Sequence, residues 1–128
     1  MTDVSVVIPF RDRHAHLRIL LQNMQPMLPP ETEYLVVEQS DGRKFNRGLL
    51  LNVGFNACTR ERVIFHDVDL VPNPDLADQY TSPWPRQVMH FGCRFNRYNN
   101  TPAYFGGVTG FVRQAFPGFS NRYYGWGG

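Results

Sequence analysis

Two aspartates separated by a single residue follow an apolar run, and they are the strongest chemical signal in this sequence. The run is Val63-Ile64-Phe65, and the aspartates are Asp67 and Asp69. Carboxylate oxygens are hard ligands that suit Mg²⁺ or Mn²⁺. A cation held there could bridge two phosphates of a nucleotide diphosphate and neutralise the charge on a departing group. An Asp-x-Asp spacing also occurs in solvated turns, but its place after a strand-like run favours a metal site.

Arginines stand near the same predicted strand ends. Arg11 and Arg13 follow the apolar run at residues 4–10, and Arg47 follows the one at residues 34–38. The planar guanidinium donates two parallel hydrogen bonds to phosphate or carboxylate, so these side chains could clamp a diphosphate. Any one of them could equally be an exposed arginine at the start of a loop.

Aromatic residues and glycines complete the set of candidates. Phe10 and Phe45 could stack on a nucleotide base, although core packing is the alternative for each. Gly106-Gly107 would let the backbone approach a ligand closely. Trp126, between two glycines, is a candidate for stacking on a sugar, or else a packed lid.

Composition limits the class of protein. The chain has 128 residues, of which 42% are hydrophobic and 19% charged, which is typical of one globular domain. A net charge of +2 does not indicate a nucleic-acid partner. No apolar run approaches the roughly 20 residues of a membrane span. The first strand begins almost at Met1, which leaves no room for a signal peptide, so we expect a cytoplasmic protein.

The hydrophobic patterns predict an α/β fold. Short apolar runs predict strands, and the i, i+3, i+4 spacing of apolar residues predicts helices between them. Strands are expected at residues 4–10, 34–38 and 62–65, with helices near 17–28 and 46–58. This order favours a parallel sheet, in which ligands bind beyond the carboxyl ends of the strands. We therefore expect three polar clusters to converge there: Arg11 with Arg13, residues 39–47, and Asp67 with Asp69.

Single residues refine this expectation. Asp12 is expected at the start of the first helix, and Asn46 as the cap of the second. Gly54, inside the second helix, predicts a close packing contact. Residues 72–86, with four prolines, are predicted to be a surface loop, and 87–91 and 107–112 to be further strands. Cys58 and Cys93 have no metal-binding spacing and are interpreted as core thiols.

Several short segments together resemble the β-1,4-galactosyltransferase family. Six segments occur in the family's order and spread over almost the whole chain: Pro9-Phe10-Arg11-Asp12-Arg13, Phe45-Asn46-Arg47, Leu51-Asn52-Val53-Gly54-Phe55, Asp67-Val68-Asp69-Leu70, Tyr104-Phe105-Gly106-Gly107-Val108 and Gly125-Trp126-Gly127-Gly128. The resemblance implies a Rossmann-like nucleotide-diphospho-sugar transferase fold of the GT-A type. It also implies a metal-dependent, inverting transfer of galactose from UDP-galactose to a carbohydrate acceptor, with Mn²⁺ (or Mg²⁺) as cofactor.

The resemblance also implies a role for each matching position. The residues expected to contact UDP are Pro9, Phe10, Arg11, Arg13, Phe45 and Arg47. Asp67 would meet the nucleotide sugar, Val68 would lie against the nucleotide, and Asp69 would bind the metal. Gly107 would face the donor sugar, and Tyr104 matches the position that favours galactose over its N-acetyl form. Trp126 would be the catalytic, mobile tryptophan that closes over donor and acceptor.

Departures from the family pattern leave other functions open. His90 stands where the family has a lysine that helps bind the phosphates, and we expect it among the donor-binding residues. His66 stands where animal members carry a small residue. The family continues beyond the position of Gly128 with acidic residues, one of which would be the base that an inverting displacement needs. We therefore expect residues 1–128 to form a single, incomplete donor-binding domain, truncated at its C-terminal end. The alternatives are a non-catalytic sugar-nucleotide or carbohydrate-binding module, and a metal-dependent nucleotidyl- or phosphotransferase.

Overall fold

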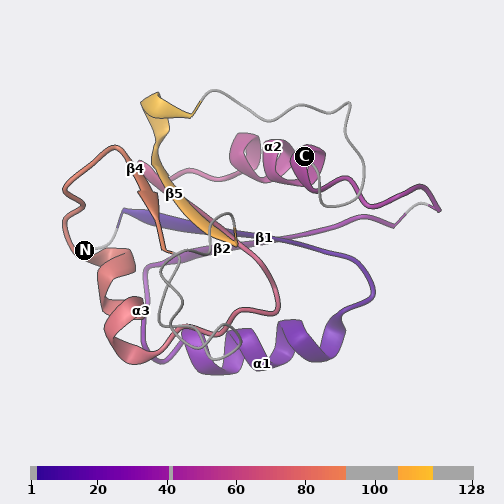
Figure 1. Ribbon diagram of the computed structural model, residues 1–128, viewed down its shortest axis with the longest axis horizontal. Helices are drawn as coiled ribbons and strands as arrows, with labels where there is room; N and C mark the ends of the chain where they lie inside the picture. The colour runs from indigo at the N-terminus through magenta and orange to yellow at the C-terminus, as the bar shows by residue number, and fades with distance from the viewer. Residues whose placement is uncertain (1–2, 41, 92–106, 117–128) are drawn as a thin grey trace.

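A five-stranded sheet organises the part of the chain that the structure describes, and it has helices on both faces (Figure 1). The structure is a computed structural model that describes residues 3–40, 42–91 and 107–116. The sheet has the strand order β2-β1-β3-β5-β4. Its strands are β1 (Val4–Phe10), β2 (Glu33–Glu38), β3 (Arg62–His66), β4 (Val88–His90) and β5 (Val108–Val112).

The sheet has a parallel part and an antiparallel part. Strand β1 runs parallel to both neighbours, with Val6 opposite Tyr34 of β2 and Ile64 of β3. Strand β5 runs antiparallel to β3, with Gly110 opposite Ile64. The predicted parallel sheet is thus confirmed for the first three strands. As predicted, their carboxyl ends meet at one edge.

The helices cover the two faces unequally. They are α1 (His14–Met24), α2 (Arg47–Ala57) and α3 (Pro74–Thr81), followed later by the short 3₁₀ helix η1 (Arg113–Ala115). Helix α2 lies over one face, and α1 and α3 lie over the other (Figure 1). None of the described helices is both long and apolar enough to cross a membrane.

Each face of the sheet has its own apolar core, because successive side chains of a strand point to opposite faces. On the α1 and α3 side, Val6 and Ile8 of β1 pack in one cluster with Leu20, Met24 and Tyr80. The α2 side holds a second cluster: Val7, Leu51, Cys58, Val63 and Phe65. All of β1 is buried, which explains why its sequence is apolar without alternation.

The predicted close contact at Gly54 is confirmed. A Cβ atom at this position of α2 would lie 2.3 Å from Cγ1 of Val7 and 3.1 Å from Cγ2 of Val37. The absence of a side chain therefore allows α2 to approach β1 and β2 closely. This contact holds the helix that carries Arg47 against the sheet.

Helix α3 corrects the prediction of a surface loop at residues 72–86. The Asn73 side chain accepts a hydrogen bond of 3.0 Å from the backbone N–H of Leu76, and Pro74 is the first helical residue. Both residues favour the start of a helix, and Asp75 adds a carboxylate to the first turn. Four prolines within residues 72–86 suggested a loop and obscured this local signal. Only Pro74 lies inside the helix, at its first position, where proline is tolerated.

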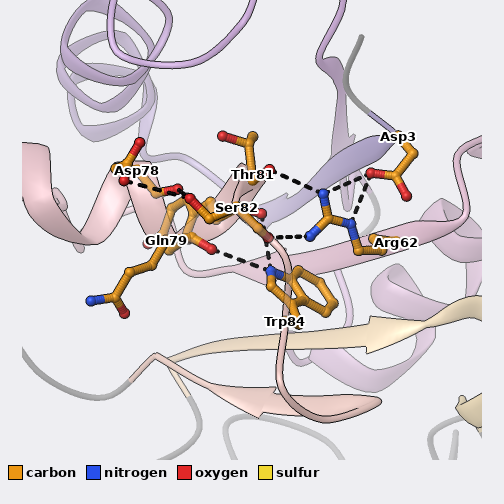
Figure 2. Close-up of polar contacts among 8 residues, drawn as sticks. Asp3, Arg62, Asp78, Gln79, Thr81, Ser82 and Trp84 are labelled. Atoms are coloured by element: carbon orange, nitrogen blue, oxygen red, sulfur yellow. Dashed lines mark hydrogen bonds and ion pairs between the residues drawn. The ribbon is translucent and has the colours of Figure 1, made fainter.

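Arg62 anchors the end of α3 to the start of β3 (Figure 2). Its guanidinium donates to the carbonyl oxygens of Ser82 (2.6 Å) and Thr81 (3.2 Å), and it forms an ion pair of 2.7 Å with Asp3. Trp84 lies under the same guanidinium, 4.8 Å from ring centre to Cζ, and its indole N–H donates to the Tyr80 carbonyl at 3.2 Å. These contacts satisfy carbonyl groups that the helix end leaves unpaired.

Candidate functional site

A pocket lies at the carboxyl ends of β1 and β3, where the topology predicts a ligand. Its volume is about 130 Å³. The residues that line it come from three separate segments and are Pro9, Phe10, Arg11, Arg13, Phe45, Asp67, Val68 and Asp69. All eight are candidates from the sequence, so the predicted convergence of the three polar clusters is observed. A volume below the usual range of roughly 300–1,000 Å³ for small-molecule sites suits only part of a nucleotide sugar.

The two aspartates lie just beyond β3, which ends at His66. Asp67 Oδ1 accepts a hydrogen bond of 3.0 Å from Nε of Arg47, and Asp69 Oδ2 accepts one of 3.1 Å from Arg13. The Arg47–Asp67 pair is largely buried, with 12% and 16% of the two side chains exposed. Each carboxylate thus has an arginine as counter-charge, and together the two pairs join the end of β3 to the segment after β1 and to the start of α2.

Asp12 turns the chain between the two arginines that follow β1. Its φ of 55° lies in the left-handed region, which residues other than glycine rarely adopt, although Asp and Asn do so more readily than most. The expected role of Asp12 at the helix start is not seen. Helix α1 begins at His14, and its cap residue Arg13 makes no side-chain capping bond. Asp12 instead forms the bend between Arg11 and Arg13, both of which line the pocket.

Gln39 holds the loop that presents Phe45, and sequence reasoning did not single it out. The Gln39 side chain donates to the carbonyl of Lys44 at 2.9 Å and accepts from the backbone N–H of Asn46 at 2.8 Å. Arg11 donates to the carbonyl of Arg43 and lies 5.9 Å from the ring centre of Phe45. The sequence gives no sign that Gln39 is buried, and it is this burial that requires hydrogen-bond partners for the amide.

The remaining candidates lie at different places. Asn46 caps α2 as predicted, since its side chain accepts from the N–H of Leu49 at 3.0 Å. The carbonyl of Gly107, a buried residue directly before β5, accepts from the backbone N–H of Asp67 at 2.9 Å. His90 is exposed at the end of the edge strand β4 and does not line the pocket. Tyr104 and Trp126 lie outside the described residues.

His66 and Tyr80 form a buried polar pair behind the aspartates. Burial lowers the pKa of His66 to about 4, and burial raises the pKa of Tyr80 well above its usual value. The imidazole is therefore neutral at pH 7. The sequence places His66 beside the aspartates but gives no sign that it is fully buried.

The described residues offer two carboxylate ligands to a cation at the pocket. Within residues 3–40, 42–91 and 107–116, no three His, Cys, Asp or Glu side chains come together in a way that could hold a metal ion. Two carboxylates are present, from Asp67 and Asp69. Mg²⁺ is commonly held by one or two carboxylates together with phosphate oxygens and water. The described residues thus fit a cation that is shared with a nucleotide, and they do not form a closed protein cage.

Sequence comparison relates the chain to glycosyltransferases. Residues 1–82 match the N-terminal region of glycosyl transferase group 7. The chain is 40% identical over 138 aligned positions to β-1,4-galactosyltransferase 6 of Rattus norvegicus, and the match covers 98% of this chain and 35% of that protein. The chain therefore spans about a third of the length of this relative.

Solved structures agree with the sequence match. The crystal structure of a Drosophila β-1,4-galactosyltransferase 7 mutant, in complex with manganese, UDP-Gal and xylobiose, superposes with a TM-score of 0.78 at 30% identity, over 97% of this chain and 56% of that one. A mannosyltransferase from Pyrobaculum calidifontis superposes with a TM-score of 0.63 at 18% identity, over 94% of this chain and 48% of that one. The second likeness shows that the fold is shared beyond the close relatives.

Proposed function

The chain belongs to the β-1,4-galactosyltransferase family, glycosyl transferase group 7, and we propose that its pocket binds UDP-galactose for transfer of galactose to a sugar acceptor. The fold is the GT-A fold of nucleotide-diphospho-sugar transferases. One observation carries the proposal. A single pocket brings together two aspartates, two arginines and two phenylalanines from three segments of the chain.

The arginines supply the positive charge that a diphosphate needs. Arg11 and Arg13 line the pocket, and Arg47 reaches its edge through Asp67. When UDP binds, we propose that Arg13 and Arg47 exchange part of their contact with the aspartates for contact with phosphate oxygens. Guanidinium groups suit this exchange because they donate in a fork to either kind of oxyanion.

The aspartates hold the cation in this proposal, with Asp69 as the ligand and Asp67 directed to the nucleotide sugar. A bound Mn²⁺ would neutralise the charge that develops on the departing diphosphate. The Drosophila relative was crystallised with manganese and UDP-Gal, which supports the choice of cation and donor. Phe10 and Phe45 would provide apolar surface for the base, with Val68 against the nucleotide.

Inversion at the sugar carbon requires a base that removes the proton of the acceptor hydroxyl. In this proposal Asp69 binds the cation and Asp67 is directed to the nucleotide sugar, so neither pocket carboxylate is assigned this role. We propose that the described residues bind the donor, and that a carboxylate outside them acts as the base. We also propose that residues outside the described ranges contact the acceptor.

Binding of UDP with and without Mn²⁺ tests the proposal. Calorimetric titration of the 128-residue chain should show UDP binding that Mn²⁺ strengthens at least about tenfold, because the cation links carboxylate to phosphate. Asp69→Asn should remove most of the gain from Mn²⁺, whereas Glu31→Gln, an equal change at an exposed residue before β2, should leave it intact. Binding of free sugars without any affinity for UDP would instead support a carbohydrate-binding module and overturn the donor site.

A further inference from the structure

Two buried side chains behind the pocket have no place in the proposed chemistry. His66 is the last residue of β3 and Tyr80 lies in α3, and neither exposes any surface. Nδ1 of His66 is 2.7 Å from the carbonyl oxygen of Asp67, and Nε2 is 3.0 Å from the hydroxyl of Tyr80. Neither residue lines the pocket. A buried histidine that bonds the backbone of a site residue calls for a physical explanation.

The direction of these hydrogen bonds follows from the groups involved. A carbonyl oxygen can only accept, so Nδ1 of His66 carries a hydrogen and donates to Asp67. In the neutral ring, Nε2 then carries a lone pair and accepts from the Tyr80 hydroxyl. The two rings meet edge to face, with centroids 5.6 Å apart. Tyr80 therefore selects the tautomer of His66 that can bond the Asp67 carbonyl.

As a result, both backbone polar groups of Asp67 are fixed. Its N–H donates to the carbonyl of Gly107 at 2.9 Å, and its carbonyl accepts from His66. The chain leaves the sheet at this point, where a strand end usually loses its regular partners. The two bonds extend the order of β3 by one residue, to the first aspartate of the pocket.

Tyr80 is itself held in place from the opposite end of β3. It lies in the last turn of α3, and the end of this helix is bonded by Arg62 and Trp84 (Figure 2). The Tyr80 ring also packs on Phe91, with centroids 4.9 Å apart. The hydroxyl that orients His66 is thus on a helix that is fixed to the same strand.

We propose that His66, oriented by Tyr80, is a positioning residue that holds the backbone of Asp67 and so places the Asp67 and Asp69 carboxylates for cation and donor. This inference rests on the proposed function of the pocket. His66 acts through the peptide group and touches no ligand. Buried partners that orient a ligating group commonly change metal affinity by about 10–100-fold when they are removed.

Two substitutions separate the roles of the two ring nitrogens. The amide nitrogen of Asn lies near the position of Nδ1, so His66→Asn can keep the bond to Asp67. The amide nitrogen of Gln lies near Nε2, so His66→Gln loses that bond. We expect His66→Gln to weaken Mn²⁺-dependent UDP binding about tenfold, and His66→Asn to retain it within about threefold.

A stability control and a ligand-free readout complete the experiment. Ile64→Val lowers stability by about 1 kcal/mol in the same strand and leaves the hydrogen bonds intact, so it should not change UDP binding. Amide hydrogen exchange at Asp67, Val68 and Asp69 should be faster in His66→Gln than in Ile64→Val at matched stability, with or without ligand.

The outcomes distinguish the two proposals. Failure of the unaltered chain to bind UDP with Mn²⁺ would overturn the proposed function, while faster exchange in His66→Gln would still support the positioning role. Equal exchange and equal UDP affinity in His66→Gln and Ile64→Val would overturn the positioning role and leave the proposed function standing. If His66→Asn weakened Mn²⁺-dependent UDP binding as much as His66→Gln does, the hydrogen bond to Asp67 would not be the cause, and the positioning role would be overturned.

Discussion

Each aspartate of the pocket has an arginine partner, and these pairs define the charge of the site at the scale of residues. The Arg13–Asp69 and Arg47–Asp67 distances are 3.1 Å and 3.0 Å. The pairs place a positive charge against each of two carboxylates that line one pocket. Cation and nucleotide are therefore expected to bind together. The phosphates draw the arginines away from the aspartates, and the cation then supplies the positive charge that the aspartates have lost.

His66 should make stability depend on pH. The unfolded chain binds a proton at this residue near its ordinary pKa of 6.5, and the folded chain only near pH 4. Between these values the unfolded state binds more protons, so the free energy of unfolding falls as the pH falls from 6.5 towards 4. The full effect is roughly 3 kcal/mol, from about 1.4 kcal/mol per pKa unit.

Urea unfolding at pH 7, 5.5 and 4.5, without metal, measures this effect. His66→Asn removes the titrating group and keeps a neutral donor, so its stability should decline less over the same range. Parallel pH profiles for the two proteins would show that His66 does not carry the effect, since carboxylates elsewhere titrate equally in both.

At the scale of elements, the approach of α2 to the sheet decides where Arg47 lies. Gly54→Ala should destabilise the fold by about 1–3 kcal/mol, because the new methyl group would overlap Val7 in the core. This loss should exceed the gain of up to about 1 kcal/mol in helix propensity. Chemical denaturation provides the measurement.

Gly42→Ala is the matched control for this change. A Cβ at Gly42 meets nothing within 4 Å, so its effect should remain within about 0.5 kcal/mol. If the two substitutions had equal effects, the contact of α2 with β1 would not be the reason for glycine at position 54.

Local sequence predicted most of the elements and missed helix α3 and the short 3₁₀ helix η1. Strands at β1, β2 and β3 and the helices between them were predicted because apolar period and length agree. Strand β1 coincides with its expected range, and α1 ends at Met24, earlier than the apolar pattern that continues to Leu28. Helix α3 was missed because prolines at residues 72, 74, 83 and 85 suggested a loop, although Asn73-Pro74 is a strong helix start.

At the scale of the whole molecule, cation and nucleotide should stabilise the fold jointly. A ligand that binds only the folded state adds about 2.7 kcal/mol at one hundred times its dissociation constant. We expect Mn²⁺ or UDP alone to raise the melting temperature little, and the two together to raise it by more than the sum. Mn²⁺ alone must compete with Arg13 and Arg47 for the aspartates.

Differential scanning fluorimetry of the chain with each ligand and with both provides this comparison. Arg18→Lys, on the exposed surface of α1, serves as control for Arg13→Lys, which should reduce the joint shift. A joint shift equal to the sum of the single shifts would mean that cation and nucleotide bind independently, contrary to a shared site.

Several predictions extend beyond the described residues. The roles expected of Tyr104 and Trp126 stay predictions, as does the assignment of residues 1–128 to one donor-binding domain. A cytoplasmic location also stays a prediction. The family and the fold, in contrast, are shown by similarity over nearly the whole chain.

The elements of the parallel sheet, the edge where a ligand would bind and the residues that line the pocket could all be predicted from the amino-acid sequence. This was possible because strand order places the carboxyl ends of parallel strands together, whatever the detailed packing. Three features are visible only in the folded molecule: which arginine pairs with which aspartate, that Gln39 holds the Phe45 loop, and that His66 and Tyr80 fix the backbone of Asp67. The two ion pairs join residues 56 and 20 positions apart, and Tyr80 reaches His66 from another element, so local patterns cannot predict them. The contacts of Gln39 and the His66–Asp67 bond are local in sequence, but they form because the fold buries these side chains.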